Sequence, residues 1–131
     1  MPIVEHAQQP WTQTRPGVQW QFIAGQVALD GEDVRPGLTM FYQRFEPGYG
    51  VPRHRHELGE EVLTVLEGEA DVLLDGARGH VTTGMTIVVP EGAVHSFLNT
   101  GSGVLRVACV LSASALKSEF LEDSQGLPAP Y

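Results

Sequence analysis

The stretch that decides how this chain folds reads GYGVPRHRH at residues 48–56 and continues to Glu61 and Gly68. A second stretch reads PEGAVH at residues 90–95 and leads to Asn99. The two stretches contain His54, His56 and His95 together with a carboxylate, and glycines and prolines lie between them. This composition is typical of a metal site in a β-sheet scaffold, because imidazole is a common metal ligand and glycine and proline mark turns.

Strand-like segments surround both stretches. They are rich in β-branched and aromatic residues, and Gly/Pro turns separate them; they cover residues 18–24, 38–46, 61–66, 70–74, 85–89, 94–99 and 104–111. Many short strands without helices between them predict an antiparallel sandwich or barrel. The one predicted helix covers residues 113–123, with Leu116, Phe120 and Leu121 at helical spacing, and residues 124–131 are expected to form a disordered tail.

The length of 131 residues predicts a single domain. We expect an N-terminal arm at 1–16, one barrel at 17–112, and the C-terminal helix and tail at 113–131. The sparse apolar residues of the arm leave two alternatives open. The arm is either mobile, or it adds to the edge of its own barrel or of a neighbouring subunit.

Composition excludes several partners. The formal charge of −8 argues against a nucleic-acid partner, and no apolar run approaches the length of about 20 residues that a membrane span requires. The N-terminal residues lack the pattern of a secretory signal, and the single cysteine, Cys109, fits a reducing compartment. We therefore expect a cytoplasmic protein, in which Cys109 is a buried and unreactive thiol.

Strand geometry brings the candidate ligands together. His54 and His56 lie two residues apart, so both imidazoles point to the same face of a strand. Glu61 follows five residues after His56, and this odd spacing would place it on the opposite face of an unbroken strand. A bend is therefore needed, which Leu58-Gly59 can supply. His95 joins them only through tertiary folding. Imidazole suits Fe, Zn, Cu and Ni, and a carboxylate extends the range to Mn.

Each of these residues also has an ordinary structural explanation when it is taken alone. A His-x-His pair is often a surface feature, Glu61 has acidic neighbours, and His95 is compatible with a satisfied core position. His6 and His80 lie outside the two stretches, and His80 is expected to be exposed. The occurrence of four candidate ligands with matched glycines and prolines favours one shared site.

The two stretches resemble the two conserved motifs of the cupin superfamily. The first motif, G-x5-H-x-H-x4-E-x6-G, is matched by Gly48, His54, His56, Glu61 and Gly68. The second, G-x5-P-x-G-x2-H-x3-N, is matched by Gly84, Pro90, Gly92, His95 and Asn99. The resemblance implies an all-β jelly-roll barrel, a homodimer, and one divalent transition metal (Fe, Mn, Zn, Ni or Cu) held by His54, His56, Glu61 and His95. Glu60 is a competing ligand if the loop bends differently.

The resemblance leaves the reaction open. We expect a small-molecule ligand that is rich in oxygen or carries a carboxylate, and a metal-dependent dioxygenase, isomerase or lyase; the alternative is a protein that binds or senses a metal or small molecule without catalysis. No catalytic residue is assigned. Alternation predicts that Leu63, Val65 and Phe97 form an apolar wall. Tyr42, Gln43 and Arg106 are candidates for polar groups in the pocket. The alternation of residues along the strands does not show which of these side chains points inward.

Overall fold

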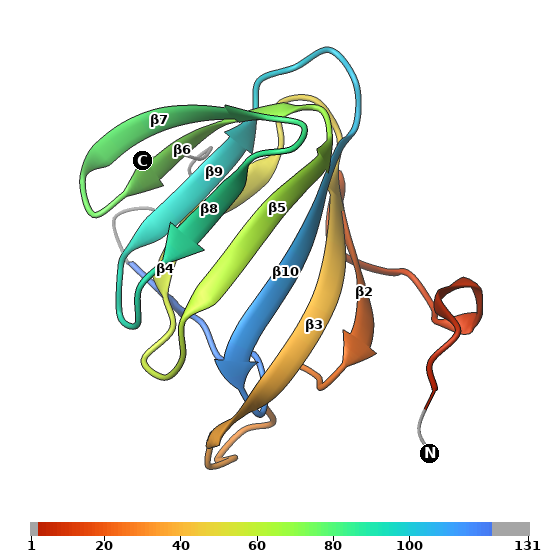
Figure 1. Cartoon of the computed structure of the whole chain (residues 1–131), viewed down its shortest axis with the longest axis vertical. Coiled ribbons are helices and arrows are strands. Elements are labelled where there is room, and N and C mark those ends of the chain that lie inside the picture. Colours follow the sequence, from red (N-terminus) through yellow and green to blue (C-terminus); the bar gives the residue numbers. More distant parts are fainter. Residues whose placement is uncertain (1–2, 122–131) are drawn as a thin grey trace.

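A computed structural model describes residues 3–121 of the chain (Figure 1). In this range it contains eleven β-strands, one short 3-10 helix (η1, His6–Gln8) and no α-helix. The paired strands all run antiparallel, so the predicted all-β jelly-roll fold is confirmed. No helix among these residues is long and apolar enough to cross a membrane.

The strands form two sheets, which curve toward each other in Figure 1. The six-stranded sheet has the order β1 (Thr12–Arg15), β2 (Val18–Ala24), β3 (Pro36–Phe45), β10 (Leu105–Ala113), β5 (Glu61–Glu67) and β8 (Thr86–Val89). The five-stranded sheet has the order β11 (Glu119–Phe120), β4 (Gly50–Arg55), β9 (His95–Asn99), β6 (Glu69–Leu74) and β7 (Ala77–Thr82).

The core lies between the sheets and follows the alternation of the sequence. Along β3, Phe41, Gln43 and Phe45 are buried, while Met40 and Tyr42 on the opposite face are partly exposed. β10 lies between β3 and β5, and its Cys109 is paired with Phe41 on one side and Leu63 on the other. This strand therefore holds the middle of the larger sheet.

Part of the N-terminal arm adds to the edge of its own sheet. Thr12–Arg15 forms β1, which pairs with β2. Before it, η1 lies on the outer face, where the side-chain amide of Gln21 donates to the carbonyls of His6 and Gln9 at 2.7 and 3.0 Å. Of the two alternatives left open for the arm, pairing with its own barrel describes this segment.

The C-terminal helix predicted at residues 113–123 is wrong over its described part, which ends at Leu121. Ala113 ends β10, and Glu119–Phe120 forms β11 beside β4. Between them, Leu116 exchanges backbone hydrogen bonds with Gln26 and Ala28, both at 2.8 Å. These contacts satisfy the backbone and bury Leu116 against the barrel, so tertiary packing overrides the helical spacing. Residues 122–131, including the predicted tail, lie outside the described range.

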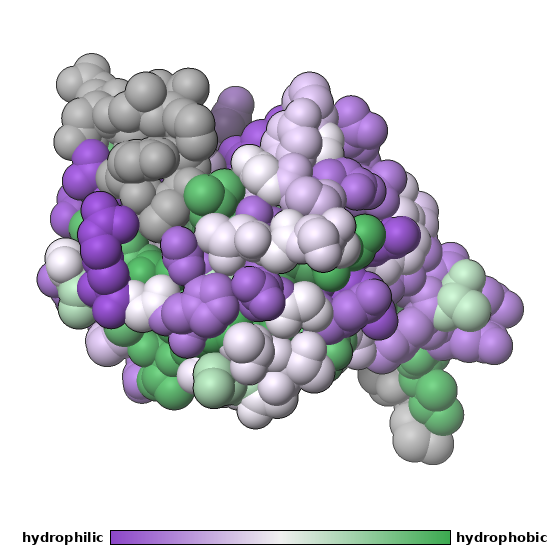
Figure 2. All heavy atoms as spheres, turned by 90° about the horizontal axis from the view of Figure 1, so that it is seen from above, coloured by the Kyte–Doolittle hydropathy of each residue, from purple (hydrophilic) through white to green (hydrophobic). Residues whose placement is uncertain are grey.

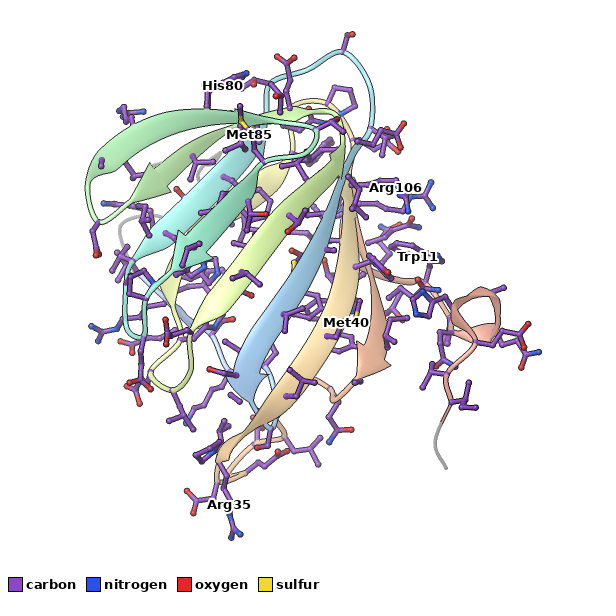
Figure 3. The ribbon with its side chains drawn as sticks, in the orientation of Figure 1. Trp11, Arg35, Met40, His80, Met85 and Arg106 are labelled. Atoms are coloured by element: carbon purple, nitrogen blue, oxygen red, sulfur yellow. The ribbon has the colours of Figure 1, made fainter. Side chains whose placement is uncertain are left out.

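β7 was not predicted as a strand, because its residues are mostly exposed and its sequence, ARGHVT, has β-branched residues only at its end. It pairs with β6 across the Asp75-Gly76 hairpin, where Asp75 has a φ of 46° and Gly76 a φ of 81°. His80 lies on this strand, is exposed as expected, and contacts the Asp71 carboxylate at 2.7 Å (Figure 3). The hairpin therefore extends the smaller sheet away from the core.

Asn99 provides a test of how the barrel is closed. Its buried side chain donates to the carbonyls of Phe45 and Gly103 and accepts from the amide of Gly101, at 2.9 to 3.0 Å. We expect Asn99→Ala to lower the free energy of unfolding by about 3 kcal/mol, because buried polar groups lose their partners. Urea denaturation measures this change. Gln13→Ala, which removes an exposed amide on β1, is the control; equal effects of the two variants would contradict this explanation.

Candidate metal centre

β4 and the residue that directly follows it carry the first two candidate ligands into the barrel. His54 and His56 are 5% and 4% exposed, so both side chains point inward as their spacing predicts. His54 pairs across the sheet with His95, the first residue of β9. The register between β4 and β9 shifts between Val51 and His54, and this irregularity places the end of β4 against the start of β9.

A tight loop between His56 and Glu61 brings both side chains to the same face, although their spacing in an unbroken strand would place them on opposite faces. Gly59 in this loop has a φ of 95°, a conformation that residues with a Cβ rarely adopt. A Cβ at this position would also lie only 3.1 Å from the backbone of Ser112. The bend expected at Leu58-Gly59 is therefore present, and it turns Glu61 inward (3% exposed), while Glu60 is exposed. The structure thus places Glu61, and not its competitor, beside the histidines.

The turn of the second motif positions His95 and is bonded to the first motif. The amide of Ala93 donates to the carbonyl of Pro90 at 3.1 Å, which closes the turn. Within the turn, Gly92 has a φ of 76°, and its amide donates to the carbonyl of His56 at 3.0 Å. The backbone therefore joins the two motifs directly, and His95 begins β9 immediately after the turn.

The three imidazoles share one hydrogen-bonding arrangement. Each Nδ1 lies within 3.0 Å of a backbone carbonyl, which can only accept; the partners are Pro52 for His54, Lys117 for His56 and Ala93 for His95. A proton is consequently on Nδ1, and in the neutral form of each ring Nε2 is left as a lone-pair donor. The three rings offer ligand atoms within 4.8 Å of one another.

The donor set fits a cation. Glu61 Oε1 lies 3.2 Å from His95 Nε2 and 3.4 Å from His56 Nε2, so an anion faces ring nitrogens that are already acceptors. The buried Nε2 of His56 has no hydrogen-bond partner of good geometry. Acceptors that converge in a buried space without a donor require a proton or a metal ion between them. A divalent transition metal meets this requirement.

The electrostatics of the metal-free cluster show the same demand for positive charge beside Glu61. Burial, reinforced by the neighbouring His95 and His56, lowers the pKa of His54 to about 3. Burial also works to lower the pKa of His56, but the adjacent Glu61 carboxylate outweighs it and the pKa is raised. Burial opposes the charged form of Glu61, yet contacts with His56 and His95 lower its pKa to about 2. Glu61 is therefore ionised and His54 neutral at neutral pH.

The C-terminal segment contributes to the site in a way that sequence reasoning missed. The Lys117 carbonyl accepts from His56 Nδ1 at 2.9 Å, and the Ser118 hydroxyl lies 3.4 Å from the same nitrogen. The ring of Phe120 stacks on His54, with ring centroids 5.3 Å apart. Helical periodicity concealed these contacts. The sequence feature that could have indicated them is the apolar content of the segment, because apolar residues favour packing of the segment against the barrel.

A cavity of about 320 Å³ opens beside the histidines. Gln43 and two of the three predicted wall residues, Leu63 and Phe97, line it, whereas Val65 is buried but is not among the lining residues. Tyr42 lies on the outer face against the ring of His6, and Arg106 points away from the barrel near Glu67 (Figure 3). The other lining residues are Thr14, Arg15, Val18, Trp20, Val27, Phe41, Val51, His54, His56, Glu61, His95, Leu116, Ser118 and Phe120.

Cys109 lies behind this cavity wall. Its thiol is fully buried and donates to the Gln43 amide oxygen at 3.6 Å. Burial, with a contribution from Glu61, raises the pKa of Cys109 well above its usual value. The thiol therefore stays protonated and orients Gln43, so that the amide NH₂ of Gln43 is left as a donor.

Comparisons with known proteins agree with the architecture. The family model described as "Cupin domain" matches residues 41–111, more than half of the chain. The chain is 34% identical over 70 residues to the HTH-type transcriptional regulator PuuR of Escherichia coli (strain K12), covering 53% of this chain and 38% of that protein. It is 30% identical over 118 residues to Auxin-binding protein 1 of Arabidopsis thaliana, covering 83% and 57%. The chain thus spans less than two thirds of either relative.

Among solved structures, KdgF from Halomonas sp. superimposes with a TM-score of 0.70. The sequence identity is 20%, and the alignment covers 86% of this chain and 94% of the other. At this identity the likeness shows the fold alone.

The pKa values predict how the metal-free protein responds to acid. His54 takes up a proton near pH 6.5 when unfolded but only near pH 3 when folded, so acidification between these values favours unfolding. The charge of Glu61 stabilises the fold above pH 4.5, and this contribution is lost as the pH falls toward 2. His56, with its raised pKa, contributes fully below pH 6.5 and loses its contribution only as the pH rises.

We therefore expect the free energy of unfolding of chelator-treated protein to fall most steeply between pH 4.5 and 3, where His54 and Glu61 act in the same direction. Urea denaturation at pH 6, 5, 4 and 3 measures this slope. The control is His54→Leu, which removes one of the two titrating groups and is expected to reduce the slope of the free energy of unfolding against pH. A slope that is the same in both proteins would show that other groups control acid unfolding.

Proposed function

Because the chain belongs to the cupin family, we propose that His54, His56, Glu61 and His95 bind one divalent transition metal and that the protein is a metal-dependent enzyme. Its substrate is a small molecule, rich in oxygen or bearing a carboxylate, that enters the cavity beside the histidines. The observation that carries the proposal is the buried cluster of three imidazoles, two of which, His56 and His95, face the carboxylate of Glu61.

The charge of the site favours anionic or chelating ligands. Three neutral imidazoles and one carboxylate around a divalent ion leave a net charge of about +1. A bound ion supplies Lewis-acid polarisation of a ligand oxygen or, if it is redox-active, oxidation with O₂. Fe, Mn, Zn, Ni and Cu all suit this donor set. Both dioxygenase and isomerase or lyase chemistry are consistent with it.

The remaining residues of the cavity act on the ligand and its surroundings. Leu63 and Phe97 exclude water from one side, which strengthens electrostatic interactions inside. The NH₂ group of Gln43, oriented by Cys109, donates a hydrogen bond to a ligand oxygen. Carbonyl partners hold each imidazole in one tautomer and orientation.

A binding protein without catalysis is the alternative function. It is favoured by the similarity to Auxin-binding protein 1, which extends over 83% of this chain, and by the similarity to a transcriptional regulator over part of it. In this alternative the same residues hold a metal or a small ligand, and occupancy of the cavity is itself the signal. The predicted cytoplasmic location remains part of the proposal and rests on the single cysteine.

We also propose that two copies of the chain associate. The N-terminal arm projects at the lower right of Figure 2, with hydrophobic residues near its end. Ile3 in this arm is 80% exposed, and Val88 on the edge strand β8 is 57% exposed. Exposed apolar groups on an arm and at a sheet edge suit contact with a second copy.

Replacement of a ligand tests the metal site. We expect His56→Ala to lower metal affinity by at least about 10- to 100-fold, because one direct ligand is lost and Glu61 loses a partner. Elemental analysis after dialysis against a defined metal concentration measures the stoichiometry. The control is His80→Ala, which removes an exposed histidine and is expected to leave the metal stoichiometry unchanged. An unaltered metal content in His56→Ala would refute the ligand assignment.

Metal depletion distinguishes the two functions. We expect chelator-treated protein to lose turnover of a panel of carboxylates, enediols and vicinal diols by at least about 100-fold, and metal addition to restore it. Equal turnover with and without metal contradicts a metal-dependent enzyme. Absence of turnover across the panel, combined with ligand-dependent thermal stabilisation, supports the binding function instead.

A further inference from the structure

Arg15 occupies an unusual position in the cavity. Sequence reasoning placed it in the N-terminal arm, but the structure places it at the end of β1, among the lining residues. The register of β1 and β2 shifts between Gln13 and Arg15, so that Thr14 and Arg15 both lie opposite Val18. Such a bulge redirects side chains, and all three of these residues line the cavity.

The guanidinium of Arg15 is held in place but not neutralised. One of its nitrogens donates to the carbonyl of Gly50 at 2.7 Å. Within residues 3–121 it makes no ion pair, and four of its five N–H donors remain for other acceptors. Burial lowers the pKa of Arg15, since desolvation disfavours the charged form, and no carboxylate in the described part of the chain offsets this effect.

The acidic residue that lines the cavity does not act as a counter-ion for Arg15. Among residues 3–121, Glu61 is the only acidic residue that lines the cavity, and it contacts His56 and His95. A partly desolvated cation facing a cavity without a counter-ion favours an anionic ligand. Its planar fork suits a carboxylate, which can accept two parallel hydrogen bonds. The chain carries a net charge of −8, so this local positive charge is contrary to the overall charge.

The position of Arg15 limits the shape of the ligand. Its partner, Gly50, and the metal-site residue His54 lie four residues apart on the extended strand β4, which corresponds to about 13 Å along the strand. The cavity walls are mainly apolar and include the aromatic side chains of Trp20, Phe41, Phe97 and Phe120. A molecule that contacts both the histidines and the guanidinium is therefore elongated and has an apolar body.

We propose that Arg15 is the anion anchor of this cavity, and that the ligand is an elongated carboxylic acid whose apolar body lies against the aromatic walls and whose carboxylate is bound by Arg15. The inference rests on the proposed function in that it places the ligand in the same cavity. It adds the class of ligand and a specificity-determining residue on the N-terminal strand.

The test uses phenyl carboxylic acids of increasing length: benzoate, phenylacetate, 3-phenylpropionate and 4-phenylbutyrate, each beside its neutral amide. Calorimetry measures their binding to the full chain, both metal-loaded and chelator-treated. We expect at least one acid to bind about 10- to 100-fold more tightly than its amide, and Arg15→Gln to remove this preference. Arg15→Lys keeps the positive charge but not the planar fork, so this variant is expected to retain part of the preference for the acid over the amide.

Arg106→Gln is the matched control, because it removes one arginine charge outside the cavity. It is expected to bind the acids as the unmodified protein does. Thermal denaturation verifies that each variant folds, and elemental analysis is expected to find an unchanged metal content in Arg15→Gln. Acids that bind no better than their amides, or a preference that survives in Arg15→Gln, would overturn the proposal. Failure of the metal site alone would instead leave the Arg15-dependent preference in the metal-free protein.

Discussion

The bonds between the three imidazoles and backbone carbonyls are the constraint on which the rest of the site depends. Each carbonyl comes from a different part of the chain: Pro52 within β4, Ala93 before β9, and Lys117 in the C-terminal segment. The imidazoles converge only when these three segments are in place together. The ligand geometry is therefore a property of the closed barrel, and no short peptide carrying the motif has it.

Two positions of unusual backbone conformation make this closure possible. Gly59 bends the loop that turns Glu61 inward, and Gly92 both forms the turn before His95 and bonds to the carbonyl of His56. At the outer end of the motifs, the amide of Gly48 donates to the carbonyl of Asn99 at 3.0 Å, so the first and last residues of the motif region also meet. The glycines of the motif thus have separate physical functions, as turns and as points of close backbone contact.

The sequence predicted what depends on local periodicity and motif spacing. Alternation correctly placed Leu63, Val65 and Phe97 inward, and motif spacing singled out Glu61, the residue that lies beside the histidines. It could not decide between Tyr42 and Gln43, because the facing of a strand depends on its register with its neighbours. It missed Arg15 in the cavity because a bulge is set by pairing between strands. The predicted helix failed because Leu116 has the spacing of a helix but packs as part of an extended segment.

The central place of β10 has a consequence for how the protein is made. β10 joins β3 to β5, although it leaves the ribosome after both of them. Until it emerges, each of these strands has an unpaired edge, and most of the barrel core is exposed. The Lys117 carbonyl emerges later still, so the candidate ligands can reach their final arrangement only after the segment that follows β10 has been synthesised. Any metal that this cluster binds can therefore find all its ligands in place only in chains whose synthesis has passed Lys117.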